Sequence, residues 1–262
     1  MSDLSLAELP RELSPSLLPL ARKTRVREVK YAVPGRLADA VRQWMRRHLR
    51  PDPYASGPFG DEYSTSTLYL DTPRLGILLR APDAGRSKYR VRRYEGSGFV
   101  FLERKLRLPD RILKHRSLLP EDALARLGES DFRDEAGCEW FRRRMQAKGL
   151  SPVCRVSYER TARQCTLAGG PVRLTLDCSL RARRADGFDF GESVETPVPG
   201  GFAVLEMKYA GDLPPLLKSL LEAFPLTPVR LSKYREACVA LNLCDAATLR
   251  AAGRPLPIFS HE

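Results

Sequence analysis

The sequence predicts an α+β fold built on one largely antiparallel β-sheet. About seven or eight segments show the two-residue alternation of strands, and helical segments interrupt them irregularly instead of following each strand. The turn sequence Glu95-Gly-Ser-Gly98 between two such segments is typical of a β-hairpin. The 262 residues, 43% of them hydrophobic, suffice for one sizeable core, and no repeat or linker divides them. We therefore expect a single domain.

The first half of the chain supplies a strand, a helix and three further strands. The first strand ends at Pro34-Gly35, and the helix after it places Leu37, Val41 and Trp44 on one face. Three prolines and two glycines make residues 51–62 a loop. In chain order we predict a strand at 25–33, a helix at 36–49, and strands at 63–71, 87–94 and 99–108.

The second half of the chain is less regular. Its apolar residues recur at helical spacing in some segments and at strand spacing in others. In chain order we predict helices at 120–127 and 134–148, strands at 153–163, 172–180 and 202–209, and helices at 213–223 and 232–243. Residues 185–201 are rich in glycine and proline, so we expect an exposed excursion there.

Charged side chains recur on one face of at least five of these strands. Successive residues of a strand point to opposite faces, so Lys88, Arg90 and Arg92 share one face, and Glu28 shares another with Lys30. The same parity groups Glu103 with Lys105, Arg173 with Asp177, and Glu206 with Lys208. The opposite faces of these strands are mostly apolar.

A half-exposed sheet would show the same alternation. The predicted helices favour another interpretation, because each needs an apolar sheet face to cover, so the charged faces must turn toward water or toward one another. If the sheet curls closed, the charged faces line a lumen. Roughly ten cations with only four acids would be unstable there without counterions, so we expect an elongated polyanion as the ligand.

The four acids, Glu28, Glu103, Asp177 and Glu206, allow two roles. They either form internal salt bridges with the lysines and arginines, or hold Mg²⁺ or Mn²⁺ that bridges phosphate oxygens. Phosphoryl transfer depends mainly on positioning and charge neutralisation, so cations with a few carboxylates suit it. Both roles remain open at this point.

Few other functions find support. The 44 basic and 32 acidic residues give a net charge of +12, which indicates an anionic partner in general. No Walker, dinucleotide-binding or G-x-S-x-G motif occurs, and neither the three histidines nor the six cysteines show metal or triad spacing. The arginine-rich segments 42–50 and 142–148 are more typical of solvated helix faces than of nucleic-acid-binding surfaces, which makes nucleic acid an unlikely partner.

The opening residues 1–21 carry three acids and three prolines, unlike a signal peptide. No apolar run approaches the roughly 18 residues that a membrane helix needs. We expect a cytoplasmic protein without a membrane segment in this chain, and a membrane partner stays possible.

Nine ordered motifs are similar to those of the VTC (vacuolar transporter chaperone) domain, a branch of the triphosphate tunnel metalloenzymes and a relative of the CYTH proteins. They are Glu28-Val-Lys-Tyr31, Ser66-Thr-Leu-Tyr-Leu-Asp-Thr-Pro73, Lys88-Tyr-Arg-Val-Arg-Arg-Tyr94, Leu102-Glu-Arg-Lys105, Lys114-His-Arg116, Ser157-Tyr-Glu-Arg160, Val172-Arg-Leu-Thr-Leu-Asp177, Leu205-Glu-Met-Lys208 and Ser232-Lys-Tyr234. On this resemblance the chain divides into a leader at 1–24, the tunnel domain at 25–245 and a tail at 246–262.

The resemblance implies a closed, eight-stranded antiparallel β-barrel with helices packed on the outside and a cationic lining that holds a triphosphate or polyphosphate chain. The residues it assigns to catalysis are Lys30, Arg90, Arg92, Lys105 and Lys208. Those it assigns to phosphate binding are Lys88, Lys114, Arg116, Arg160, Arg173 and Lys233. It gives Glu206 as the ligand of Mn²⁺ or Mg²⁺, with Glu28 and Glu103 as further metal candidates.

The function expected from the resemblance is a metal-dependent polyphosphate polymerase that transfers the γ-phosphate of ATP onto a growing chain. Hydrolysis of tripolyphosphate or nucleoside triphosphates, and polyphosphate binding without catalysis, remain alternatives. The E-x-E-x-K signature of the CYTH branch is reduced here to Glu28-Val-Lys30, which disfavours adenylate cyclase or thiamine triphosphatase activity.

Overall fold

The fold is described from a computed structural model. It covers residues 26–53, 55, 59–108, 112–129, 132, 137–191 and 193–258. The predicted leader at 1–24 lies outside the described residues. No helix in the part of the chain that the structure describes is long and apolar enough to cross a membrane.

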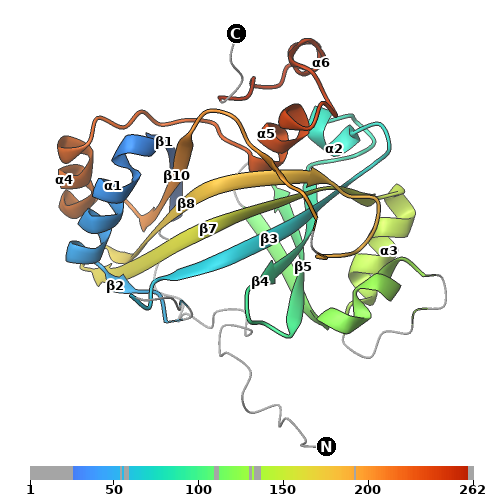
Figure 1. Ribbon diagram of the computed structural model, residues 1–262, viewed down its shortest axis with the longest axis horizontal. Coiled ribbons are helices and arrows are strands. Elements are labelled where there is room, and N and C mark those ends of the chain that lie inside the picture. The colour runs from blue at the N-terminus through green and yellow to red at the C-terminus, as the bar shows by residue number, and fades with distance from the viewer. Residues whose placement is uncertain are drawn as a thin grey trace, which may run out of the picture.

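The centre of the molecule is one antiparallel sheet, as the alternation predicts. Eight strands follow one another across it in the order β1 (Val26–Pro34), β10 (Phe202–Ala210), β8 (Gly170–Arg184), β7 (Ser151–Leu167), β3 (Glu62–Asp71), β4 (Ser87–Tyr94), β5 (Phe99–Arg107) and β6 (Ile112–Pro120). Two short strands, β2 (Arg50–Pro51) and β9 (Thr196–Pro197), pair with β7 and β8. In Figure 1 the long strands β8, β7 and β3 cross the molecule, and β4 and β5 lie beyond them.

The sheet curls strongly, because side chains from its two ends meet. Lys105 of β5 and Glu28 of β1 form an ion pair at 3.5 Å, although five strands separate β1 from β5 in the strand order. The charged faces therefore turn toward one another and form a concave surface, which we call the concave face.

The sheet is not closed into a barrel, so that detail of the prediction is not confirmed. Among the described residues, no hydrogen-bonded pairing joins β1 to β6. The free edge of β1 is instead taken by the segment before the last helices: Val229 donates its backbone N–H to the carbonyl of Lys30 at 2.8 Å, and Tyr31 bridges Pro228. Because this segment satisfies the β1 backbone groups, β6 does not need to complete the ring.

Helices cover the outer face of the sheet at both ends (Figure 1). Helix α1 (Gly35–His48) and helix α4 (Pro215–Ala223) pack on β1, β10 and β8 through apolar residues such as Trp44, Leu174 and Met207. The first residue of α1, Gly35, has to be glycine, because a Cβ there would lie 2.6 Å from the carbonyl oxygen of Gly201. At the other end, helix α3 (Glu139–Lys148) buries Phe141 against β4 and β5.

Helix α5 (Lys233–Ala240) departs from the predicted architecture, because it packs on the concave face. Tyr234 stacks on Tyr69 of β3 with ring centroids 5.0 Å apart, and Cys238 lies in the same cluster as Val156 of β7. The prediction that all helices pack outside is therefore wrong for α5. The short helices α2 (Gly76–Leu79) and α6 (Ala246–Ala251) flank it, and Leu249 of α6 is buried in the same cluster.

Three further segments differ from the predicted elements. β6 was not predicted as a strand, because its exposed Ile112 and Leu113 break the expected alternation. The helix predicted at 120–127 forms two short 3₁₀ turns, η3 (Glu121–Ala123) and η4 (Ala125–Gly128). The excursion predicted at 185–201 includes β9 and is not fully exposed, since Phe190 is buried in the α3 cluster.

Candidate functional site

The concave face gathers the cations that the motifs single out. Cross-strand neighbours on it include Lys88 with Lys105, Lys105 with Lys114, and Lys208 with Arg173. Eleven predicted cations lie on or reach this face: Lys30, Lys88, Arg90, Arg92, Lys105, Lys114, Arg116, Arg160, Arg173, Lys208 and Lys233. The four carboxylates predicted with them, Glu28, Glu103, Asp177 and Glu206, lie there too. Side-chain parity was therefore sufficient to assemble most of the site.

The carboxylates are already paired, which is the internal salt-bridge role that the sequence left open. Arg90 and Arg116 both donate to Glu103. Glu206 forms ion pairs with Lys208 at 2.5 Å and with Lys30 at 3.6 Å. Burial alone would raise the pKa of each glutamate, but these cations hold the pKa of both Glu103 and Glu206 well below the usual range. Both carboxylates are ionised at neutral pH.

Asp177 is the most deeply buried acid of the concave face, with no exposed surface. Arg160 and Lys233 each donate to it at 2.6 Å, so it ties β7 and the first residue of α5 together. Burial raises its pKa, but the two cations outweigh burial and lower it to about 2. The sequence named Asp177 as an acid on the charged face without assigning it to the site.

The Asp177 pairs give a prediction about stability. Asp177→Asn is expected to lower the free energy of unfolding at pH 7 by about 3 kcal/mol, because it leaves two buried cations without their counter-charge. The pKa in the folded state lies below the unfolded value of about 3.9. The carboxylate therefore stabilises the fold above about pH 4, and this contribution is lost between about pH 4 and pH 2.

Urea unfolding of both proteins at pH 7 and at pH 3 checks this. The difference between them should shrink at the lower pH. Asp39→Asn serves as the control, since Asp39 is 87% exposed in its pair with Arg42 and should change little. An equal effect of Asp177→Asn at both pH values would contradict the assignment.

Arg92 is a deeply buried cation of the concave face whose hydrogen-bond partners are hydroxyl groups. Its side chain is only 6% exposed and donates to the hydroxyl groups of Thr67 at 3.3 Å and Tyr94 at 3.5 Å. Among the described carboxylates none forms an ion pair with it, and the same holds for Lys88 and Lys114. A buried guanidinium is normally paired with an anion, so Arg92 indicates where an anionic ligand belongs.

Arg173 is less available than the resemblance implies. Asp52, in the loop after α1, pairs with it at 2.6 Å, and Tyr63 accepts a weak hydrogen bond from it at 3.5 Å. An anion would have to compete with the Asp52 carboxylate for Arg173. No sequence pattern predicts this contact, because residue 52 belongs to a loop whose path depends on the tertiary fold.

The three metal candidates differ in how easily a cation could reach them. Glu103 is held by two guanidinium groups, whereas Glu206 and Glu28 are held by lysines. Glu28 and Glu206 are diagonal neighbours on β1 and β10, since Glu28 pairs with Lys208, two residues from Glu206. A hard divalent cation often takes one or two carboxylates and completes its shell with phosphate oxygens and water. Glu206 with Glu28 fits such a cation, and Glu103 fits the role of orienting Arg90 and Arg116.

Within the described residues no group of three or more His, Cys, Asp or Glu side chains is arranged to hold a metal ion. A metal at Glu206 would therefore depend on the phosphates of a ligand for the rest of its coordination. This is the arrangement in which metal and phosphate chain bind together.

Tyrosines form a part of the concave face that the motif roles did not include. Tyr158 is 3% exposed and accepts a hydrogen bond from Arg160 at 3.3 Å. Lys233 lies over its ring at 4.8 Å, and Tyr94 contacts Arg92. The alternation placed Tyr158 on the face of Arg160, which was the signal that could have found it.

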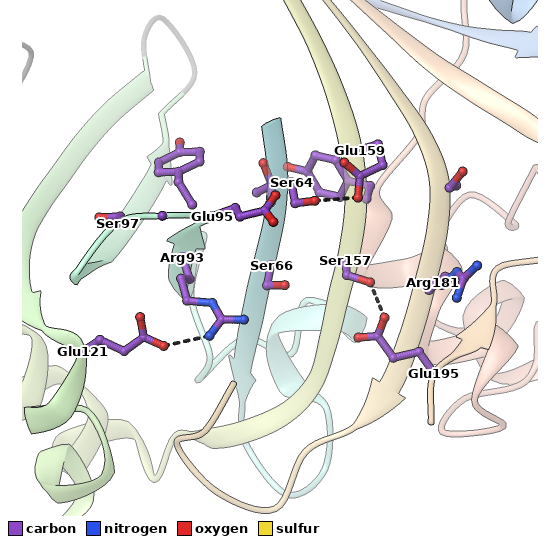
Figure 2. A pocket seen from close by; sticks show the side chains of 15 residues that line it. Ser64, Ser66, Arg93, Glu95, Ser97, Glu121, Ser157, Glu159, Arg181 and Glu195 are labelled. Atoms are coloured by element: carbon purple, nitrogen blue, oxygen red, sulfur yellow. Dashed lines mark hydrogen bonds and ion pairs between the residues drawn. The ribbon is translucent and has the colours of Figure 1, made fainter. Parts of the chain in front are cut away.

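A separate pocket of about 700 Å³ opens on the other side of the sheet. Figure 2 shows Ser64, Ser66 and Ser157 on its strands, with Arg93 and Glu121 on one side and Arg181 and Glu195 on the other. Most of its side chains alternate with those of the concave face, although Tyr94 and Tyr158 also border it, and none of the fourteen predicted site residues lines it. Four glutamates against two arginines make it a poor site for a polyanion.

The fold and the concave face together define a class of protein: an α+β protein whose curled antiparallel sheet encloses an excess of lysine and arginine. The family model of the VTC domain matches residues 25–242, so the chain belongs to the VTC domain family. No curated protein matches the sequence.

Solved structures with a similar fold have low sequence identity. An adenylate cyclase candidate from Bacillus halodurans is 15% identical, covers 78% of this chain and 92% of its own, and gives a TM-score of 0.48. An adenylyl cyclase candidate from Hippeastrum, described as having a dominant triphosphatase activity, is 16% identical over 90% of this chain and 99% of its own, with a TM-score of 0.44. The PH1819 protein of Pyrococcus horikoshii is 16% identical over 79% of this chain and 91% of its own, with a TM-score of 0.43.

Proposed function

We propose that the protein is a metal-dependent polyphosphate polymerase that transfers the γ-phosphate of ATP onto a polyphosphate chain held on the concave face. The excess of cations on one face, eleven predicted cations with the four predicted carboxylates and Asp52, is the observation that supports this most strongly. Membership of the VTC domain family points the same way. An ATP donor further implies a cytoplasmic location for this chain.

The arginines and the lysines of the concave face would have different roles in the reaction. Arg90, Arg92 and Arg160 present planar guanidinium groups, which bind phosphate oxygens in pairs. Lys30, Lys105 and Lys208 present single charges that neutralise the charge developing on the transferred group. These residues act by positioning and electrostatics, since phosphoryl transfer needs little covalent chemistry from the protein.

Mn²⁺ or Mg²⁺ would be held by Glu206, with Glu28 beside it. When bound, the metal supplies positive charge that bridges phosphate oxygens. Lys30 and Lys208 form ion pairs with the Glu206 carboxylate in the ligand-free protein. When the metal and the polyphosphate chain bind, these lysines would turn from Glu206 toward phosphate oxygens.

The experiment is to incubate the purified chain with ATP and Mn²⁺ and to separate the products on a gel. We expect a ladder of polyphosphate that disappears on chelation of the metal. Release of inorganic phosphate from tripolyphosphate without a ladder would assign the protein as a triphosphatase. Neither product, together with salt-sensitive binding of polyphosphate, would assign a binding module and refute the polymerase.

A further inference from the structure

Lysine and arginine are not mixed evenly on the concave face. The chain has 35 arginines and nine lysines, so arginine is its usual cation. Five of the nine lysines nevertheless lie together at one end of the face. We call them the lysine cluster: Lys30, Lys88, Lys105, Lys114 and Lys208.

The members of the lysine cluster are neighbours on five strands. Lys88, Lys105 and Lys114 stand in register on β4, β5 and β6. The positive charge of Lys30 acts on both Lys88 and Lys105, and that of Lys208 acts on Lys114. The lysines of β1 and β10 therefore face those of β4 to β6 across the curl of the sheet.

Arg173 stands in register with Lys208, but three other guanidinium groups lie further along the same face. Arg116 donates to Glu103, and Arg92 donates to the hydroxyl group of Tyr94. Arg160 donates to Asp177 and to the hydroxyl group of Tyr158. An elongated anion on this face would therefore meet arginines along one part of its length and lysines at the other.

The chain itself covers the lysine end. Lys88 donates to the hydroxyl group of Ser232 at 3.3 Å, and Lys30 lies 3.5 Å from the carbonyl oxygen of Leu231. Both acceptors belong to the segment that runs along the free edge of β1 and leads into α5. An anion that extends from the arginines toward the lysines would therefore meet this segment, and its end would lie there.

Lys88 depends on such an anion for its charge. No described carboxylate pairs with it, and the neighbouring charges with the largest effect on its pKa are the cations Lys30 of β1, Lys105 of β5, Arg254 beyond α6 and Arg90 of β4. Loss of hydration and these cations lower the pKa of Lys88 to about 7. The Lys88 side chain remains open to solvent inside the concavity, so its loss of hydration is limited. We therefore attribute the lowered pKa mainly to repulsion by the four neighbouring cations.

Terminal and internal phosphates of a linear chain differ in charge. An internal phosphate carries one negative charge, whereas a terminal phosphate has a second ionisation near pH 6 and approaches two charges above it. Lysine ammonium groups are compact, mobile charges that suit a group with three free oxygens. Lys88 and Lys114, which have no carboxylate partner among the described residues, are therefore the members of the lysine cluster that best match the terminal group, whereas Lys30, Lys105 and Lys208 already pair with Glu28 or Glu206.

We propose that the lysine cluster is the subsite for the terminal phosphate of a linear phosphate chain, with Lys88 as its specificity-determining residue. This rests on the proposed function only in requiring that the concave face bind such a chain. It assigns a direction to the chain, with its end against Ser232 and its internal phosphates along the arginines.

The test compares linear tripolyphosphate, which has two terminal phosphates, with cyclic trimetaphosphate, which has none. Calorimetric titration of the full chain in metal-free buffer at pH 7 is expected to show tighter binding of the linear anion. Lys88→Gln should lower the affinity for linear tripolyphosphate by about tenfold, because one charge-assisted hydrogen bond is lost. It should change the affinity for trimetaphosphate by less than about twofold.

Lys88→Arg gives a second readout that a merely structural role would not move. The bound dianion should raise the pKa of Lys88, so above pH 7 the wild type must take up a proton when tripolyphosphate binds. Its affinity should therefore fall with rising pH more steeply than that of Lys88→Arg, which stays charged. Lys218→Gln, on the exposed face of α4, is the matched control and should behave as the wild type.

The outcomes separate this inference from the proposed function. If Lys88→Gln weakens both anions equally, or weakens neither, while Arg92→Gln abolishes tripolyphosphate binding, the terminal subsite is wrong and the anion site stands. Identical pH profiles of the wild type and Lys88→Arg would also overturn the subsite. If the wild type binds no linear phosphate, both the proposed function and the terminal subsite are refuted.

Discussion

Arg92→Gln is expected to weaken tripolyphosphate binding by about a hundredfold. The Arg92 guanidinium is 6% exposed and has only hydroxyl partners at 3.3 and 3.5 Å, so a bound phosphate would be its first anionic partner. Two charge-assisted hydrogen bonds from one guanidinium together contribute about 3 kcal/mol. Calorimetric titration at fixed salt measures the loss, and salt must be matched because phosphate binding depends steeply on it.

The same substitution should have a smaller effect on the stability of the ligand-free protein. Burial and repulsion from Arg160 lower the pKa of Arg92, but Tyr158 and Glu103 outweigh them and hold the pKa above its usual range, so the fold stabilises the charged guanidinium. Removing it is therefore expected to lower the midpoint of thermal unfolding by about 2–4 °C. A large loss of binding in a protein that is still folded at the assay temperature assigns the effect to the ligand site.

Arg92→Lys separates charge from geometry. Lysine keeps the positive charge but not the planar fork, so it should lose about tenfold in affinity, less than glutamine does. Arg181→Gln, at an exposed position in the separate pocket, should leave affinity unchanged. Arg92→Gln with wild-type affinity, or with reduced thermal stability and wild-type affinity, would show that Arg92 is a structural cation.

Glu206→Gln is expected to abolish metal-dependent turnover, with a loss of about a hundredfold to a thousandfold. Lysines rather than arginines neutralise its carboxylate, and a second acid, Glu28, lies diagonal to it. The amide keeps the size of the side chain but loses the charge that a divalent cation requires. The measurement is the rate of product formation over a titration of Mn²⁺ and of Mg²⁺.

Metal-free binding should respond in the other direction. Glu206 now competes with phosphate for Lys30 and Lys208, so Glu206→Gln should bind tripolyphosphate without metal at least as tightly as the wild type. Glu159→Gln, which loses only the hydrogen bond that Ser64 donates on the outer face, is the matched control. A Glu206→Gln protein with an unchanged rate and an unchanged metal requirement would place the metal elsewhere.

Much of the site follows from local rules, because a strand's two faces are fixed by parity alone. The positions of Lys88, Arg90 and Arg92 follow from one eight-residue strand, β4, whose bounds match the predicted ones. Each charged face was thus known before the order of the strands was. The apolar residues on the opposite faces, such as Leu174 and Met207, pack under α1 and α4 as the alternation requires.

The parts that the sequence did not predict depend on contacts between distant segments. The edge of β1 pairs with Val229, about 200 residues later in the chain, and this contact leaves the sheet open. Helix α5 buries Lys233, Arg235 and Glu236 together with its apolar residues, so the apolar periodicity of its sequence could not tell whether it packs inside or outside the sheet. The pairing of Arg173 with Asp52 likewise depends on a loop that carries no periodic signal.

A structure of the full chain with bound tripolyphosphate tests the central claim most directly. We expect the phosphates on the concave face, with oxygens within hydrogen-bonding distance of the Arg92 guanidinium and one terminal phosphate beside Lys88 and Ser232. Phosphates bound instead at the outer pocket, or a concave face still empty at saturating tripolyphosphate with its internal ion pairs intact, would contradict it.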